Sequence, residues 1–282
     1  MGSIYWITSY PKSGNTWMRM FLSHLVLEKS SKSFMNQLQS FAPDENSAKF
    51  YQAVSTIPLA LLDDKGLAKI RPAAQQVAAD AVDGYLFMKT HHLLGVHHGT
   101  PTINLKATAG AIYVVRNPLD VVVSYSEFRK MSIDQTIDKI LMSGRALARP
   151  RNGSYQLSGS WGEHVDSWSK KPSEYICTVR YEDLVTDPFE TFSKVVKFLK
   201  VNVPEDQIRY AIDQTSISKL KGEEQKEGFR EKPKETTQFF RSGKIGEWKL
   251  RLTEQQVQRV TSNFAEPMKR FGYLDASGNI AS

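Results

Sequence analysis

Cysteine is almost absent from this chain of 282 residues, in which Cys177 is the only one. A single cysteine excludes an intramolecular disulfide framework and a metal site of the CxxC type. Cys177 lies in the apolar run 175–179, which predicts a buried structural thiol. The sequence also lacks an apolar run near the roughly 20 residues that span a bilayer, and its N-terminus shows no signal peptide. These absences predict a soluble, cytoplasmic protein without a membrane partner.

The composition is that of an ordinary globular protein, with 40% hydrophobic and 24% charged residues. The formal net charge is +7. Such an excess indicates either an anionic partner or a solvated basic face, and composition alone leaves both interpretations open.

Apolar segments at 4–9, 85–88, 111–115 and 175–179 predict strands. Helical periodicity starts near Asn15 and near Pro118, and returns at 188–199, 205–212 and 253–265. Strands that alternate with helices predict an α/β fold, here a single domain over residues 1–282 with a central parallel sheet flanked by helices. We expect no regular structure in three polar stretches, residues 29–50, 143–160 and 219–238.

A P-loop-like turn joins the first strand to the first helix, with the sequence YPKSGNTW at residues 10–17. A helix N-terminus attracts anions, Gly14 lets the backbone approach a ligand, and Lys12 adds a full charge. Short polar side chains add further donors: Ser13, Asn15 and Thr16. The turn lacks the leading Gly and the Gly-Lys pair of a Walker A motif, which argues against an ATP- or GTP-hydrolysing enzyme. The alternative is an ordinary strand–turn–helix with a surface lysine.

The turn resembles the 5′-phosphosulfate loop of sulfotransferases that use 3′-phosphoadenosine 5′-phosphosulfate (PAPS), whose common form is YPKSGTTW. Residues 112–125, IYVVRNPLDVVVSY, resemble the family's 3′-phosphate segment, in which Arg116 and Ser124 would hold that phosphate. The planar guanidinium of an arginine at a strand end can bind a phosphate through two hydrogen bonds. Ser124 lies about two turns along the next helix. The alternative for Arg116 is an ion pair with Asp120.

Lys89-Thr90-His91 resembles the catalytic KTH or KSH segment of the same family. The resemblance implies that His91 is the general base, which suits its unperturbed pKa near working pH. It also implies that Lys89 stabilises the transferring sulfuryl group and that Lys12 neutralises charge on the leaving phosphate.

Four histidines close together raise the alternative of a metal site: His91, His92, His97 and His98. Adjacent side chains on an extended segment point in opposite directions, and no acidic residue or cysteine nearby completes a ligand set. We therefore expect that no metal is bound or required.

Residues 241–249, RSGKIGEWK, resemble the family's RKGxxGDWK loop, which covers the 3′-phosphate and adenosine. The resemblance assigns this contact to Arg241 and to the N–H groups of Ser242 and Gly243. Ser242 replaces the usual lysine, and we expect the absence of that lysine to weaken nucleotide retention. Glu247 replaces the usual aspartate. The resemblance also implies three adenine contacts, from Trp17, Tyr181 and Thr215, although Trp17 could instead be a core aromatic. The charged stretch 219–238 is the predicted lid.

The motifs occur in family order over residues 4–252. Because of these motifs, the chain is identified as a member of the PAPS-dependent sulfotransferase family. The resemblance implies transfer of a sulfuryl group from PAPS to a hydroxyl or amine of a small-molecule acceptor, such as a natural product, with no nucleic-acid partner. The alternatives are a non-catalytic adenosine 3′,5′-bisphosphate-binding protein and a nucleotide-dependent phosphotransferase. The sequence identifies neither the acceptor nor the oligomeric state.

Overall fold

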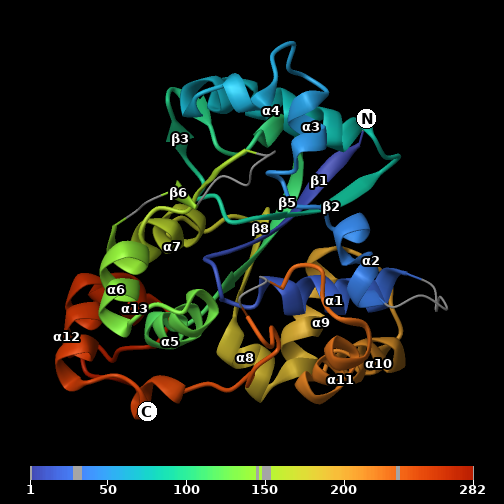
Figure 1. Ribbon diagram of the computed structural model, residues 1–282. Helices are drawn as coiled ribbons and strands as arrows, with labels where there is room; N and C mark the ends of the chain where they lie inside the picture. Colours follow the sequence, from blue (N-terminus) through green and yellow to red (C-terminus); the bar gives the residue numbers. More distant parts are fainter. Residues whose placement is uncertain (1, 28–33, 144–145, 148–153, 233–235, 282) are drawn as a thin grey trace. The chain divides into compact units, whose positions relative to one another are not determined.

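The computed structural model contains a four-stranded sheet and describes residues 2–27, 34–143, 146–147, 154–232 and 236–281. The strands follow the order β2-β1-β5-β8 (Figure 1). β1 (Ser3–Ser9) and β2 (Tyr85–Thr90) are parallel, and their register places Ser3 opposite Tyr85 and Thr8 opposite Thr90. The predicted α/β class with a central parallel sheet is confirmed.

Contacts between residues divide the chain into two compact units. The sheet unit contains Met1–Pro11, Ala42–Tyr113 and Asp138–Thr178, and the helical unit contains Lys12–Phe41, Val114–Ile137 and Val179–Ser282. β5 (Thr108–Val115) and β8 (Ile176–Arg180) run from the first unit into the second at their last two residues. The expectation of a single domain over residues 1–282 stays a prediction.

The sheet unit packs a long helix, α4 (Asp64–Asp80), against β1 and β2. Trp6 on β1 is fully buried, and its Nε1 donates to Thr108 Oγ1 at 2.9 Å. Two short hairpins pair β3 with β4 and β6 with β7. The remaining elements of this unit are α3 (Ala48–Gln52), η1 (Leu59–Leu61), β3 (Val96–His97), β4 (Thr100–Pro101), η2 (Leu105–Ala107), β6 (Ala146–Leu147), β7 (Gln156–Leu157) and α7 (Trp161–Ser169).

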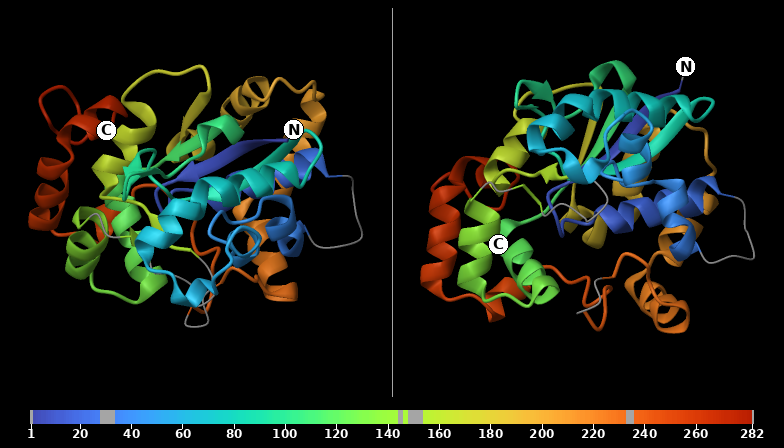
Figure 2. Two further views of the ribbon diagram at one scale, coloured as in Figure 1. Left: turned by 90° about the horizontal axis from the view of Figure 1, so that it is seen from above. Right: turned by 45° about the horizontal axis from the view of Figure 1, so that its top comes forward.

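The helical unit gathers its helices in two groups, which the views of Figure 2 also show. One group contains α1 (Asn15–Val26), α2 (Phe34–Phe41), α8 (Tyr181–Thr186), α9 (Pro188–Phe198), α10 (Glu205–Gln214) and α11 (Ile217–Glu227). The other contains α5 (Pro118–Arg129), α6 (Ile133–Thr136), η4 (Glu247–Leu250), α12 (Glu254–Asn263) and α13 (Ala265–Arg270), and the π-helical turn η3 (Ile137–Met142) follows α6.

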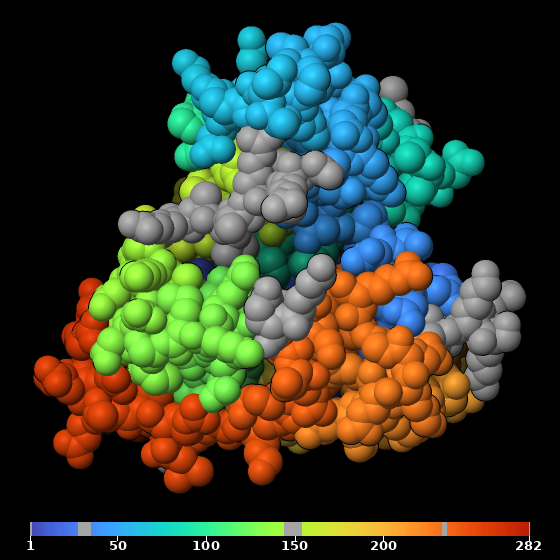
Figure 3. All heavy atoms as spheres, in the orientation of Figure 1, coloured from blue at the N-terminus to red at the C-terminus, as the bar shows by residue number. Residues whose placement is uncertain are grey.

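The second group forms a continuous surface in Figure 3, where α5 and α6 lie against α12. Asp134 of α6 links the two, because its carboxylate accepts from Gln256 Nε2 at 3.1 Å and from Arg259 Nη1 at 2.8 Å. None of the described helices combines the length and the apolar character needed to cross a bilayer.

The predicted strands and helices all occur, with ends shifted by a few residues. The helix predicted near 253–265 begins with a capping box: the Thr253 hydroxyl accepts from the Gln256 N–H, and the Gln256 side chain accepts from the Thr253 N–H.

The expectation of irregular structure in three polar stretches is wrong in part. α2 forms within residues 29–50 and α3 extends across their end, while β6 and β7 form within 143–160. α11 begins two residues before the stretch 219–238 and occupies its first half. α11 was missed because its sequence, ISKLKGEEQKE, carries few apolar residues, and only Leu220 and Glu224 of the helix are buried. Residues 233–235 of the predicted lid lie outside the described residues.

A buried carboxylate, Glu45, joins α3, α4 and the segment after β2 inside the sheet unit. Its Oε1 accepts from Tyr51 Oη at 2.5 Å and from Gln75 Nε2 at 3.2 Å. Its Oε2 lies 3.2 Å from His92 Nε2, and Arg71 Nε lies 3.6 Å from Oε1. Burial alone would raise the pKa of Glu45, but His92, Arg71 and Tyr51 outweigh it and lower that pKa to about 2. The charge of Glu45 therefore stabilises the folded unit.

Replacing Glu45 with glutamine tests this charge. The folded pKa of about 2 lies below the unfolded value of about 4.3, so the stabilisation is complete above about pH 4.5 and is lost as the pH falls toward 2. We expect Glu45→Gln to lower the free energy of unfolding by about 3 kcal/mol at pH 7, because it leaves Arg71 without its charged partner. Urea unfolding at pH 7, 4.5 and 3 measures this difference.

The matched control is Glu174→Gln, which removes an exposed carboxylate from the same unit. We expect it to change stability by less than about 0.5 kcal/mol. A difference between wild type and Glu45→Gln that stays constant from pH 7 to pH 3 would contradict the assignment.

Candidate functional site

The P-loop-like turn follows β1 and leads into α1 through two left-handed residues, Lys12 at φ 67° and Gly14 at φ 105°. Residues with a side chain rarely adopt such φ values, whereas glycine adopts them readily. Space is equally restricted, because a Cβ atom at Gly14 would lie 2.8 Å from Tyr181 Cδ2. Glycine is therefore required at position 14 by both conformation and packing.

Donor groups of this turn fit a phosphate. Gly14 is the N-cap of α1, and neither a capping side chain nor an acidic residue occupies the first turn. Anions bind well to such a helix start. Ser13 is fully buried, and its hydroxyl has no hydrogen-bond partner among the described residues. An unpaired buried hydroxyl is unusual and calls for a partner such as a bound ion, so the donor set matches an anionic ligand.

The ammonium group of Lys12 lies over two aromatic rings. Its Nζ is 4.0 Å from the ring centroid of Phe128 on α5 and 4.7 Å from that of Phe239. Cation–π contacts of this kind contribute about 0.5–2 kcal/mol each. Neither phenylalanine belongs to the sequence motifs that predict the site.

Arg116 follows the last residue of β5 and binds two backbone carbonyls. Its Nη1 donates to the carbonyl of Lys12 at 3.0 Å and its Nη2 to that of Lys244 at 3.1 Å. The guanidinium also stacks over the Tyr181 ring, with Cζ 4.2 Å from the centroid. Arg116 thus links the P-loop-like turn to the loop at 241–249.

Asp120, the alternative partner of Arg116 in the sequence, accepts two backbone hydrogen bonds. The donors are the N–H groups of Gly246 at 2.7 Å and Trp248 at 3.2 Å. These bonds fix the end of the 241–249 loop to the first turn of α5.

The three residues predicted to contact adenine lie together. Trp17 Nε1 donates to Thr215 Oγ1 at 3.4 Å, and the Trp17 ring meets the Tyr181 ring edge-on at 5.8 Å between centroids. Trp17 is half-buried and also packs against a core cluster around Met20 and Leu38. Burial raises the pKa of Tyr181 although the Arg116 guanidinium opposes it, so the phenol stays neutral and donates to the Gly243 carbonyl at 3.1 Å.

The loop at 241–249 differs from the family form at two positions, and the two replacements contact each other. Ser242 Oγ donates to Glu247 Oε2 at 2.7 Å, and Arg241 Nη2 donates to the same oxygen at 2.6 Å. Burial alone would raise the pKa of Glu247, but these two donors lower it. Arg241 is therefore paired with a carboxylate of its own loop.

Within the helical unit, one contact network thus joins most of the predicted nucleotide residues: Lys12, Gly14, Trp17, Arg116, Tyr181, Thr215 and Gly243. Ser124 lies half-buried on α5 and takes no part in these described contacts.

The predicted base, His91, follows β2 in the sheet unit. Its Nδ1 lies 2.7 Å from the carbonyl oxygen of Ser9 at the end of β1. A carbonyl oxygen only accepts, so Nδ1 carries the proton and the neutral ring has its lone pair on Nε2. This is the tautomer that a base acting through Nε2 requires.

Lys89 forms an ion pair with Asp44, a residue that the sequence analysis missed. Its Nζ lies 2.6 Å from Asp44 Oδ2, and the exposed fractions of the two side chains are 16% and 31%. Asp44 Oδ1 accepts from Gln156 Nε2 at 3.0 Å, and the backbone N–H of Lys89 donates to the carbonyl of Pro43 at 2.9 Å. The segment 43–45 therefore lies along the end of β2, as an added bridge of the sheet.

The other histidines of this region have structural contacts. His92 is buried beside Glu45, and His97 Nδ1 lies 2.7 Å from Tyr155 Oη. Among the residues that the structure describes, no group of three potential ligands from His, Cys, Asp and Glu could hold a metal ion.

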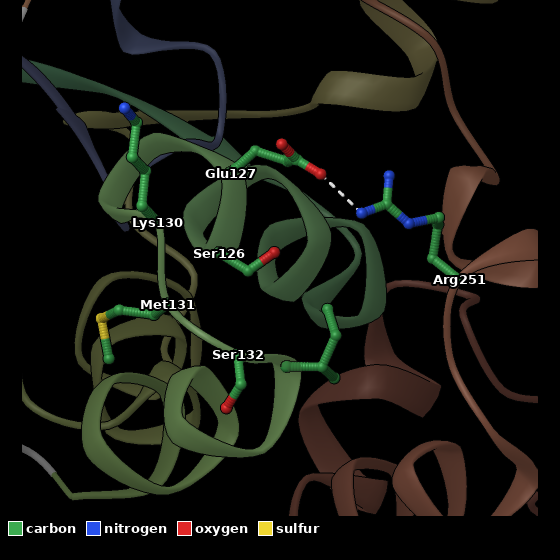
Figure 4. Close-up of a pocket in the computed structure, with 7 residues that line it drawn as sticks. Ser126, Glu127, Lys130, Met131, Ser132 and Arg251 are labelled. Atoms are coloured by element: carbon green, nitrogen blue, oxygen red, sulfur yellow. Dashed lines mark hydrogen bonds and ion pairs between the residues drawn. The ribbon is translucent and has the colours of Figure 1, made fainter. Parts of the chain in front are cut away.

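A surface pocket of the helical unit is lined by residues of α5, by the segment that follows it and by Arg251 (Figure 4). The ion pair between Glu127 Oε1 and Arg251 Nη2, at 2.5 Å, borders it. Its lining contains none of the predicted site residues: Ser126, Glu127, Lys130, Met131, Ser132, Ile133 and Arg251.

Comparison with known proteins identifies the family. The family model described as "Sulfotransferase domain" matches residues 4–272. The chain belongs to the sulfotransferase family. This confirms the family and the enzyme class predicted from the motifs: the protein is a sulfotransferase, an enzyme that transfers a sulfuryl group.

Curated relatives of this sulfotransferase share about a quarter of its residues. Sulfotransferase 1A1 of the dog, Canis lupus familiaris, is 26% identical over 279 residues, covering 94% of this chain and 83% of the dog protein. Flavonol 3-sulfotransferase of Flaveria bidentis is 23% identical over 281 residues, covering 95% and 82%.

Solved structures share the fold of this sulfotransferase. Mouse sulfotransferase SULT7A1 in complex with PAP superposes with a TM-score of 0.60 at 18% identity, covering 98% of this chain and 86% of the mouse chain. Retinol dehydratase in a complex with retinol and PAP gives a TM-score of 0.65 at 19% identity, covering 94% and 81%.

Asp120 offers a direct test of how this sulfotransferase orders the 241–249 loop. We expect Asp120→Ala to lower the free energy of unfolding by about 1–3 kcal/mol, because it leaves the N–H groups of Gly246 and Trp248 without their acceptor. Amide hydrogen exchange at these two positions should accelerate by about tenfold or more. The Val257 amide in α12 is the internal reference, and its exchange should not change.

Asp120→Asn, which keeps one carbonyl acceptor, should give an intermediate effect. Equal exchange of the Gly246 amide in wild type and Asp120→Ala would show that the carboxylate does not order the loop.

Proposed function

We propose that this sulfotransferase transfers the sulfuryl group of PAPS to a hydroxyl or amine of a small-molecule acceptor. The observation that carries the proposal is the phosphate-binding turn, in which an uncapped helix start and the unpaired buried hydroxyl of Ser13 present donors to an anion. Further support comes from the mouse SULT7A1 and retinol dehydratase structures, both of which were solved in complex with PAP.

In this proposal the helical unit binds the nucleotide. Lys12 and the turn residues Ser13, Gly14, Asn15 and Thr16 bind the 5′-phosphosulfate. Arg116 and Ser124 bind the 3′-phosphate, together with Arg241 and the N–H groups of Ser242 and Gly243. The adenine contacts come from Trp17, Tyr181 and Thr215. The shared contacts of Arg116 and Tyr181 support this assignment, because one guanidinium orients two of the proposed phosphate segments.

His91 takes the acceptor proton on Nε2, while the acceptor oxygen or nitrogen forms a bond to sulfur and the bond from sulfur to the 5′-phosphate oxygen breaks. The hydrogen bond from Nδ1 to Ser9 supports this role, since it leaves the Nε2 lone pair for the proton. Lys89 stabilises the negative charge on the sulfuryl oxygens, and its ion pair with Asp44 holds the ammonium group in place. Lys12 neutralises the charge that develops on the leaving phosphate.

The acceptor is a small molecule in this proposal, and the reaction takes place in the cytoplasm without a metal ion. The names of relatives illustrate the range of acceptor chemistry: one is a flavonol 3-sulfotransferase, and retinol dehydratase was solved with retinol and with androsterone.

Calorimetry with adenosine 3′,5′-bisphosphate (PAP) and with ATP, both without Mg²⁺, tests the nucleotide assignment. We expect the bisphosphate to bind at least about tenfold more tightly than ATP, because only it carries the 3′-phosphate for Arg116, and one hydrogen bond to a charged group is worth about 1.5–3 kcal/mol. A preference for ATP, or no binding of either nucleotide, would overturn the assignment of Lys12 and Arg116.

Substitution of His91 by alanine tests the base. Turnover should fall by about 10²–10⁴-fold while the affinity for adenosine 3′,5′-bisphosphate stays within about twofold, because a general base acts on the proton and not on the nucleotide. His98→Ala, at an exposed position of the same segment, is the control and should keep normal turnover. Near-normal turnover of His91→Ala would refute the role as base.

A further inference from the structure

Arg19, on the first turns of α1, is a fully buried cation that contacts the phosphate-binding turn. Its Nε donates to Asn15 Oδ1 at 3.0 Å, and its Nη2 donates to Thr16 Oγ1 at 3.3 Å. Both partners belong to the turn that we propose to bind the 5′-phosphosulfate.

The guanidinium fixes the polarity of these two side chains. Arginine only donates hydrogen bonds, so the Asn15 carbonyl oxygen and one lone pair of the Thr16 hydroxyl are directed to it. The groups directed elsewhere are therefore the Asn15 NH₂ group and the Thr16 hydroxyl proton, which are donors. A phosphate or sulfate group accepts hydrogen bonds, so this polarity suits an anion.

Glu231 fixes the guanidinium from the other side. Its two carboxylate oxygens accept from Nη1 at 2.8 Å and from Nη2 at 2.6 Å, which is the bidentate geometry of the strongest arginine–carboxylate pairs. Glu231 itself is 15% exposed and lies two residues after Phe229, which is buried in the core cluster with Met20 and Phe240. The carboxylate is therefore attached to a segment anchored in the core.

We infer that Arg19 and Glu231 are positioning residues for the 5′-phosphosulfate: Glu231 orients Arg19, and Arg19 presents the donors of Asn15 and Thr16 to the 5′-group. This inference rests on the proposed function and assigns roles to two residues outside the set that we propose to bind the nucleotide. The effect of breaking the pair should be confined to ligands that carry a 5′-phosphate.

Calorimetry on Glu231→Gln with two nucleotides tests the inference. Adenosine 3′,5′-bisphosphate carries the 5′-phosphate, and adenosine 3′-monophosphate lacks it. We expect the dissociation constant of the bisphosphate to rise about tenfold, the size of one weakened hydrogen bond to a charged group, and that of the monophosphate to stay within about twofold. Glu231→Asp, which keeps the charge, should restore part of the loss.

Glu227→Gln is the matched control, because it removes an exposed carboxylate at the end of α11 without touching Arg19. It should leave both dissociation constants within about twofold of wild type. If Glu231→Gln does not yield folded protein, Glu231→Asp is measured in its place. We then expect a smaller rise in the dissociation constant of the bisphosphate, and again no change beyond about twofold for the monophosphate.

A second measurement separates positioning from general stability. Thr16→Val should weaken bisphosphate binding in the wild type but add little to the loss in Glu231→Gln, because the threonine donor is already misdirected there. Additive losses would contradict the inference, as would equal weakening of both nucleotides or unchanged binding by Glu231→Gln. No bisphosphate binding by the wild type would instead overturn the proposed function itself.

Discussion

Gly14 and the Tyr181 ring lie so close that no side chain fits between them, and the proposed nucleotide region depends on this contact. The same ring supports the Arg116 guanidinium on its face, meets Trp17 edge-on, and places its hydroxyl against the Gly243 carbonyl. A single rigid aromatic thus sets the spacing of segments far apart in the chain. Displacing it would disturb all of them together.

The cations proposed for catalysis and binding all have partners within the protein. Lys12 lies over Phe128 and Phe239, Lys89 pairs with Asp44, and Arg241 pairs with Glu247. Buried or half-buried charges are costly without such partners. A polyanionic ligand therefore competes with the contacts that these cations already make within the protein. Its net affinity is the free energy of the new contacts with the ligand minus that of the internal contacts they replace. The internal partners let each unit hold these positive charges without destabilising the fold.

Much of the fold could be predicted from the sequence, because apolar periodicity marks buried strands and helices such as β1 and α9. The P-loop-like turn and the Lys89–His91 segment are short and local, so their residues could be recognised directly. Asp44, Phe128 and Glu231 could not, because their roles come from contacts with residues distant in the chain. α11 was missed for a different reason: only two of its residues are buried, so its sequence carries no clear apolar face.

The carbonyl oxygen that orients His91 belongs to the backbone of Ser9. Every residue type supplies that oxygen, so no exchange of the side chain at position 9 can remove it. The position of the backbone at Ser9 therefore determines the tautomer of His91. The sequence around it can change extensively without loss of this hydrogen bond, as long as β1 and β2 stay paired. An aspartate that orients a histidine is lost when its side chain is exchanged, whereas this hydrogen bond survives any exchange at position 9 that leaves the backbone in place.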